Sequence, residues 1–138
     1  MTDFKYDYDN PGPCCQKIKD MINYARPMIG RWPPFYRYTL GEQILNEMLL
    51  MLRLATKARL RWMNKSTLVD LDTSKEVLKA FVEEANSTIF TDKSGNKRRL
   101  LSDHSFGEWS AQIEVIGKLI GAWINSVSGR KNNKGNVP

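Results

Sequence analysis

The chain has 138 residues, 41% of them hydrophobic and 26% charged, and carries a formal net charge of +6 at pH 7. A chain of this length fits one domain that buries roughly two thirds of its unfolded surface. The longest apolar run, Met48 to Leu52, ends at Arg53 and falls far short of the ~18 residues that span a bilayer. The start of the chain lacks the apolar core of a secretory signal, so we expect a soluble, cytoplasmic protein.

Residues 1–13 are polar, carry scattered aromatic residues and end in a Pro-Gly-Pro run, which predicts a flexible N-terminal arm. From Cys14 onward, apolar residues recur at spacings of three and four, as on one face of a helix. The residues on this face are Ile18, Met21, Ile22, Ala25, Met28 and Ile29. Pro27 is expected to kink this first helix, and Gly30 with the Pro-Pro pair that follows is expected to end it.

Three Ser/Thr-x-x-Glu sequences predict the starts of three further helices. In such a capping box, the hydroxyl and the carboxylate satisfy each other's free backbone N–H groups. The boxes begin at Thr39, Thr73 and Ser105. The helix that follows Thr39 is expected to run to Trp62 or Asn64, and its apolar surface is wider than one bundle core needs. That excess predicts a second neighbour, and therefore an oligomer.

The last predicted helix has the most regular apolar pattern in the chain, the seam of a bundle. The seam consists of Phe106, Trp109, Ile113, Ile116, Ile120, Trp123 and Val127. Gly117 and Gly121 lie beside it, and because a mid-helix glycine costs about 1 kcal/mol against alanine, the pair predicts a close helix approach. Before this helix, residues 94–96 (Ser-Gly-Asn) predict a turn that we interpret as the tip of a short hairpin.

These elements predict an all-α fold, an antiparallel up-down four-helix bundle over residues 14–127. The arm of residues 1–13 precedes the bundle. Residues 128–138, rich in Gly, Asn and Lys, are predicted to form a disordered basic tail.

The composition argues against an enzyme. The only histidine is His104, and the only cysteines, Cys14 and Cys15, are adjacent and lack metal-ligand spacing. Arg99 and His104 match the Arg-x4-His spacing of some helical nucleases, but they fall in a loop before a helix, so we interpret this as coincidence. We therefore predict no catalytic residue, no metal and no cofactor.

Cations recur every four residues along the helix predicted after Thr39, which places them on one stripe about three turns long. They are Arg53, Lys57, Arg61 and Lys65, with Arg59 on the flank. Like charges at this spacing destabilise a helix by a few tenths of a kcal/mol per pair, roughly, and a bound anion would remove that strain. The stripe can also be a solvated face that keeps an oligomer soluble; we favour binding.

Two further segments are candidates for binding. The first is a basic cluster around the predicted turn, formed by Lys93, Lys97, Arg98 and Arg99, which can contact phosphates or simply be solvated. The second is residues 31–38, where aromatic residues alternate with arginines. Such a mixture can stack unpaired bases. It can equally be a stiff loop whose rings cover the end of the bundle, which is the interpretation we favour.

The sequence Trp32-Pro-Pro-Phe-Tyr-Arg-Tyr-Thr-Leu-Gly-Glu42, followed by a long helix, resembles the signature of a bacterial four-helix-bundle family. The family includes proteins encoded in ribosomal RNA intervening sequences and the accessory variability determinants (Avd) of diversity-generating retroelements. Leu119-Ile-Gly-Ala-Trp123-Ile resembles the ending of the family's last helix. The resemblance covers residues 14–127, and the basic character and the tryptophan in the last helix favour the Avd branch.

The resemblance implies a ring-shaped homopentamer with a positively charged surface. It also implies a reverse transcriptase and its template RNA as partners, with a supporting role in mutagenic copying and no chemistry by this chain. The basic stripe and the basic cluster would then grip the RNA or the enzyme. The alternative is a four-helix scaffold that binds only proteins.

Overall fold

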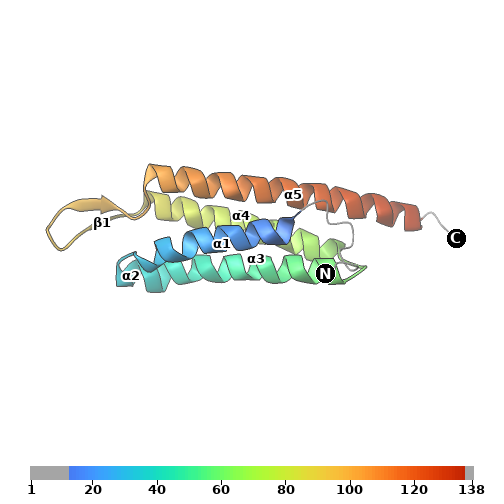
Figure 1. Ribbon diagram of the computed structural model, residues 1–138, viewed down its shortest axis with the longest axis horizontal. Helices are drawn as coiled ribbons and strands as arrows, with labels where there is room; N and C mark the ends of the chain where they lie inside the picture. Colours follow the sequence, from blue (N-terminus) through green and yellow to red (C-terminus); the bar gives the residue numbers. More distant parts are fainter. Residues whose placement is uncertain (1–12, 136–138) are drawn as a thin grey trace.

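The structure is a computed structural model that describes the backbone of residues 13–135 and the side chains of residues 13–129. Four long helices lie side by side in this part of the chain (Figure 1). They are α1 (Cys14–Gly30), α3 (Glu42–Leu60), α4 (Lys65–Ser87) and α5 (Asp103–Gly135). The N-terminal arm predicted for residues 1–13 lies outside the described residues except for Pro13.

The connections are short elements at the two ends of the bundle. A single helical turn, α2 (Pro34–Tyr36), and a π-helical turn, η1 (Arg37–Gly41), lead from α1 into α3. Strands β1 (Ile89–Thr91) and β2 (Lys97–Arg99) pair antiparallel between α4 and α5 and confirm the predicted hairpin. Figure 1 shows this hairpin projecting from the end of the bundle where α2 lies.

Each long helix packs against two others: α3 contacts α1 and α4, and α5 contacts α4 and α1. Successive long helices run in opposite directions (Figure 1). The predicted helical bundle is therefore confirmed for the described residues. The predicted ring of subunits concerns contacts with further copies of the chain and stays a prediction.

The core follows the predicted periodicities. The apolar face predicted for the first helix is buried except for Met28, which packs at the edge of the core. The seam predicted for the last helix is buried except for Phe106. Trp109 and Trp123, on α5, are completely enclosed. Apolar side chains at spacings of three and four fall on one side of a helix, so burying that side removes them all from water.

The capping box predicted at Thr39 is wrong. Thr39 lies inside η1, and its hydroxyl donates a 2.7 Å hydrogen bond to the backbone carbonyl of Phe35. Helical backbone already begins at Pro34, because proline lacks an N–H and has a φ angle suited to a first helical position.

The other two capping boxes are also misplaced. Thr73 lies within α4 and donates to the carbonyl of Val69 at 3.1 Å. The helix begins at Lys65, and Asn64 before it donates its side-chain amide to the carbonyl of Ala58, which ties this start to the end of α3. A threonine hydroxyl in a helix can bond the carbonyl four residues earlier, so Ser/Thr-x-x-Glu alone does not define a start.

The third box misses the start of α5 by a few residues. The helix begins at Asp103, and the Ser102 hydroxyl accepts the backbone N–H of Ser105 at 3.1 Å. Ser102 therefore does the capping that the pattern assigned to Ser105.

Two helix ends and one close approach also differ from prediction. α3 ends at Leu60, with Arg61 extended, rather than at Trp62 or Asn64. α5 continues to Gly135, beyond the predicted start of the tail at residue 128, because adding residues to a formed helix is easier than nucleating one. The disorder predicted for residues 128–138 stays a prediction. No close helix approach occurs at Gly121, where a Cβ would meet nothing within 4 Å.

The hairpin loop is organised around the carboxylate of Asp92. One oxygen accepts the backbone N–H groups of Ser94 and Asn96, both at 2.9 Å, and the other accepts Nε of Arg98 at 2.7 Å. Gly95 takes a φ of 85°, a conformation that glycine adopts without strain. These bonds hold the tip of the hairpin in one conformation.

We expect Asp92→Ala to speed amide hydrogen exchange at Ser94 and Asn96 while leaving exchange in the core helices unchanged. The bonds from Arg98 and the backbone lower the pKa of Asp92 below its ordinary 3.8. The stabilisation of the hairpin tip by the Asp92 carboxylate is therefore fully present above pH 3.8. It is lost as the pH falls through the lower pKa of the folded state. Amide exchange measured by NMR checks this, with Asp70→Ala as the control. Equal exchange at the tip in both variants would contradict it.

Candidate nucleic-acid interface

Within the described residues, no catalytic or metal-binding group is assembled. His104 is exposed in the first turn of α5. Arg99, which has the Arg-x4-His spacing relative to His104, donates to Asp103 at 2.7 Å and to Oδ1 of Asn86 at 2.8 Å. No cluster of three metal-ligating side chains occurs in this part of the chain. No helix described here combines the length and apolar character needed to cross a bilayer.

Both cysteines face the core at the start of α1. Burial, and then the neighbouring Cys15 thiol, raises the pKa of Cys14 to about 12. Burial also raises the pKa of Cys15, although a hydrogen bond from Arg59 works in the other direction. Because the thiolate is the reactive form, burial in the core disfavours reaction at these thiols.

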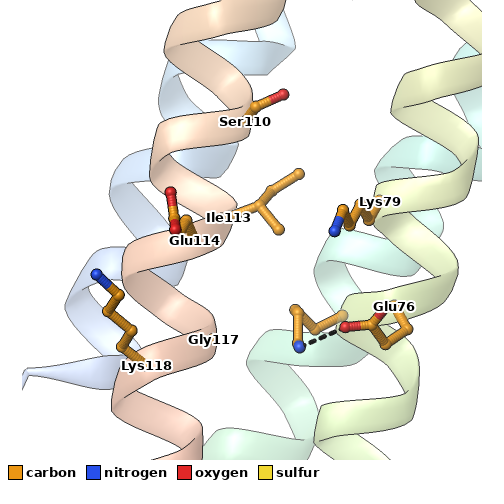
Figure 2. A pocket seen from close by; sticks show the side chains of 8 residues that line it. Glu76, Lys79, Ser110, Ile113, Glu114, Gly117 and Lys118 are labelled. Atoms are coloured by element: carbon orange, nitrogen blue, oxygen red, sulfur yellow. Dashed lines mark hydrogen bonds and ion pairs between the residues drawn. The ribbon is translucent and has the colours of Figure 1, made fainter.

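A groove of about 450 Å³ opens between α4 and α5. Figure 2 shows Lys79 on α4 and Ile113 on α5 pointing toward one another across it. Nζ of Lys75 is neutralised by Glu76 at 2.6 Å and by Asp72 at 3.2 Å. The lining also contains Lys79, Lys118 and Glu114. With cations and acids this evenly mixed, the groove has no marked preference for anions.

The structure divides the predicted basic stripe between two helices. Arg53 and Lys57 are exposed on α3, but Arg61 lies in the extended connection, and Lys65 is the first residue of α4. The prediction of one continuous helical stripe is therefore wrong, because α3 stops at Leu60. None of these four cations forms an ion pair with a described residue.

Arg59 differs from the other cations of this region. Its side chain is half-buried, and it hydrogen-bonds the thiol of Cys15 on α1. Arg59 therefore helps to join α3 to α1, and part of its hydrogen-bonding capacity is used inside the bundle.

The predicted basic cluster lies on the hairpin. Arg98 is paired with Asp92 and Arg99 with Asp103, each at 2.7 Å. Lys93 and Lys97 are exposed, and neither has an ion-pair partner among the described residues. The hairpin projects from one end of the bundle, whereas the α3–α4 connection lies at the other (Figure 1). The two predicted basic regions therefore form separate surfaces.

The structure does join the hairpin to the aromatic segment of residues 31–38. The rings of Tyr36 and Phe90 contact each other with centroids 5.8 Å apart. Trp32 is buried, as predicted for a ring that covers the end of the bundle, but Phe35 and Tyr38 are 70% and 67% exposed. No local sequence signal indicated this contact, since it depends on how the whole bundle brings the ends of α1 and α4 together.

The comparisons with known proteins agree with the fold. A model of the bAvd-like family matches residues 14–127, which contain α1, α3 and α4 and most of α5. Searches of curated proteins and of solved structures found no match. Because the matched region covers most of the sequence and coincides with the bundle, the chain belongs to the bAvd-like family.

Proposed function

We propose that the chain is a non-catalytic accessory protein of a diversity-generating retroelement that binds the reverse transcriptase and its template RNA and supports mutagenic reverse transcription. Membership in the bAvd-like family supports the accessory role. The observation that carries RNA binding is the set of exposed cations at the α3–α4 end without acidic partners among the described residues. They are Arg53, Lys57, Arg61 and Lys65, with the half-buried Arg59 beside them.

These cations would act on phosphates through charge, without any chemistry. Each phosphate that they neutralise releases condensed counterions, so log affinity falls by about 0.7 to 0.9 per contact for each tenfold rise in salt. Cations on a rigid bundle also orient the RNA relative to the enzyme. The proposed assembly is a ring-shaped homopentamer; the exposed Leu49 and Leu50 on α3 provide apolar surface for contacts between copies.

The test is fluorescence anisotropy with a structured RNA at two salt concentrations. We expect Arg53→Glu/Lys57→Glu/Arg61→Glu to weaken binding at least tenfold and to flatten the salt dependence, since about three phosphate contacts are lost. The control is Lys17→Glu/Lys79→Glu/Lys118→Glu, which changes the net charge equally at exposed positions elsewhere. Light scattering verifies that each variant assembles like the wild type.

Equal weakening in the two triple variants would show that overall charge, and not this surface, governs binding. Absence of RNA binding by the wild type at low salt would favour the alternative, a scaffold that binds only proteins. Binding to the reverse transcriptase would then be measured with the same two variants.

A further inference from the structure

Aromatic side chains from two distant segments meet at the hairpin end of the bundle. Phe35 meets Tyr36 edge to face with centroids 5.1 Å apart, and Tyr36 contacts Phe90 of β1. Tyr38 lies under the guanidinium of Arg37, whose Cζ is 5.0 Å from the ring centroid. We refer to Phe35, Tyr36, Tyr38 and Phe90 as the aromatic platform.

The backbone that carries the two exposed rings of the platform is held by local bonds. Thr39 bonds the carbonyl of Phe35, and Arg37 donates to the carbonyl of Gly30 at 3.0 Å. Phe35 and Tyr38 are three residues apart on continuous helical backbone, Phe35 on α2 and Tyr38 on η1. A ligand that contacts both rings therefore meets a surface that needs little ordering.

The surroundings of the platform are strongly basic. Residues 31–38 and 89–103 contain six Lys and Arg against two Asp, a net charge of +4. Both acids, Asp92 and Asp103, are already paired with hairpin arginines. The two segments that carry the platform therefore have excess positive charge, and the guanidinium of Arg37 lies directly over the ring of Tyr38.

A groove of about 300 Å³ adjoins the platform and shares Phe90 with it. Its lining also includes Arg31, Arg99, Ser102 and Ser105, from the end of α1, the hairpin and the start of α5. Guanidinium and hydroxyl groups are ordinary partners of phosphate oxygens. Groups that can bind phosphate therefore lie beside Phe90, the ring through which the groove adjoins the platform.

A nucleotide carries a flat base and an anionic phosphate, so it matches both halves of this surface. Rings that stack bases, interleaved with cations, are the usual means of binding single strands. In a duplex the base faces are covered by neighbouring pairs. We propose that the aromatic platform binds unpaired nucleotides of a single-stranded nucleic acid, with bases stacked on Phe35 and Tyr38 and phosphates held by the surrounding cations. This inference rests on the proposed function for its ligand class but uses the opposite end of the bundle.

The experiment compares an unstructured oligouridine RNA with a duplex RNA of equal length by fluorescence anisotropy. Phe35→Ala/Tyr38→Ala is expected to bind the unpaired RNA at least tenfold more weakly, the effect of losing roughly one to two stacked bases, and to bind the duplex as the wild type does. Leu60→Ala/Met63→Ala, exposed at the other end, is the matched control. Phe35→Trp should retain binding, and oligouridine should quench its fluorescence more than that of the wild type.

Unchanged binding of oligouridine by Phe35→Ala/Tyr38→Ala would overturn the proposal. A smaller assembly mass for this variant, with both RNAs affected equally, would also overturn it, because the rings would then contact another copy of the chain. The triple variant at the α3–α4 end separates the two ideas. If the triple variant binds RNA normally while the platform variant loses oligouridine binding, the proposed surface on α3 is refuted and the platform stands. If the wild type binds no RNA, both proposals are refuted.

Discussion

Trp109→Ala is expected to lower the free energy of unfolding by about 3–5 kcal/mol, the usual cost of removing a large buried aromatic side chain. Trp109 has no exposed surface, and it belongs to the buried seam of α5. Its loss leaves a cavity among side chains that helices on both sides hold in place. Domains are commonly stable by about 5–15 kcal/mol, so the variant would lose a large part of its stability.

Chemical denaturation at fixed protein concentration measures this effect, since association would make stability depend on concentration. Trp109→Phe should cost much less, because phenylalanine fills most of the site and Nε1 of Trp109 has no acceptor among the described residues. Val115→Ala, on the exposed side of the same helix, should change stability by less than about 0.5 kcal/mol. Similar losses for Trp109→Ala and Val115→Ala would show that α5 does not pack with this face inward.

Gly41→Ala is expected to destabilise the protein by about 1–2 kcal/mol, although alanine normally favours a helix. Gly41 is buried with a helical φ of −61°, so space and not backbone freedom requires glycine here. A Cβ would lie 2.7 Å from Cγ2 of Ile29 and 3.3 Å from the carbonyl oxygen of Tyr36. Ile29 is itself buried and branched at Cβ, so it cannot turn aside cheaply.

Gly121→Ala is the matched variant, a helical glycine with open space where the Cβ would go. It should stabilise the protein by about 0.5–1 kcal/mol through helix propensity and reduced freedom of the unfolded chain. Thermal or denaturant unfolding of the two variants measures effects of opposite sign. A stabilised Gly41→Ala would mean that α1 and η1 do not approach each other as described.

The apolar periodicities predicted the bundle well, because they reflect a physical requirement that acts over a whole helix. A side chain such as Ile113 must face the core for its neighbours on the seam to do so as well. The capping boxes failed because a single hydroxyl has several local partners. Thr39 and Thr73 both bond carbonyls of the preceding turn, a choice that the four-residue pattern does not reveal.

The candidate site was predicted in part. The exposure of Arg53 and Lys57, and their lack of ion-pair partners among the described residues, agree with the absence of acids between Glu47 and Asp70 in the sequence. That these cations bind a partner stays a prediction. The arrangement of the stripe was not predicted correctly, because the stripe assumed a helix that continues beyond Leu60.

The sequence by itself determined that this protein is a helical bundle, which side of α1 and α5 is buried, and that its surface is basic. Those properties depend on the periodicity and composition of nearby residues. Only the tertiary structure decided that the two basic regions lie at opposite ends and that Phe90 meets Tyr36. Such contacts depend on where the helices end and how they pack, and packing energy is shared among residues far apart in the chain.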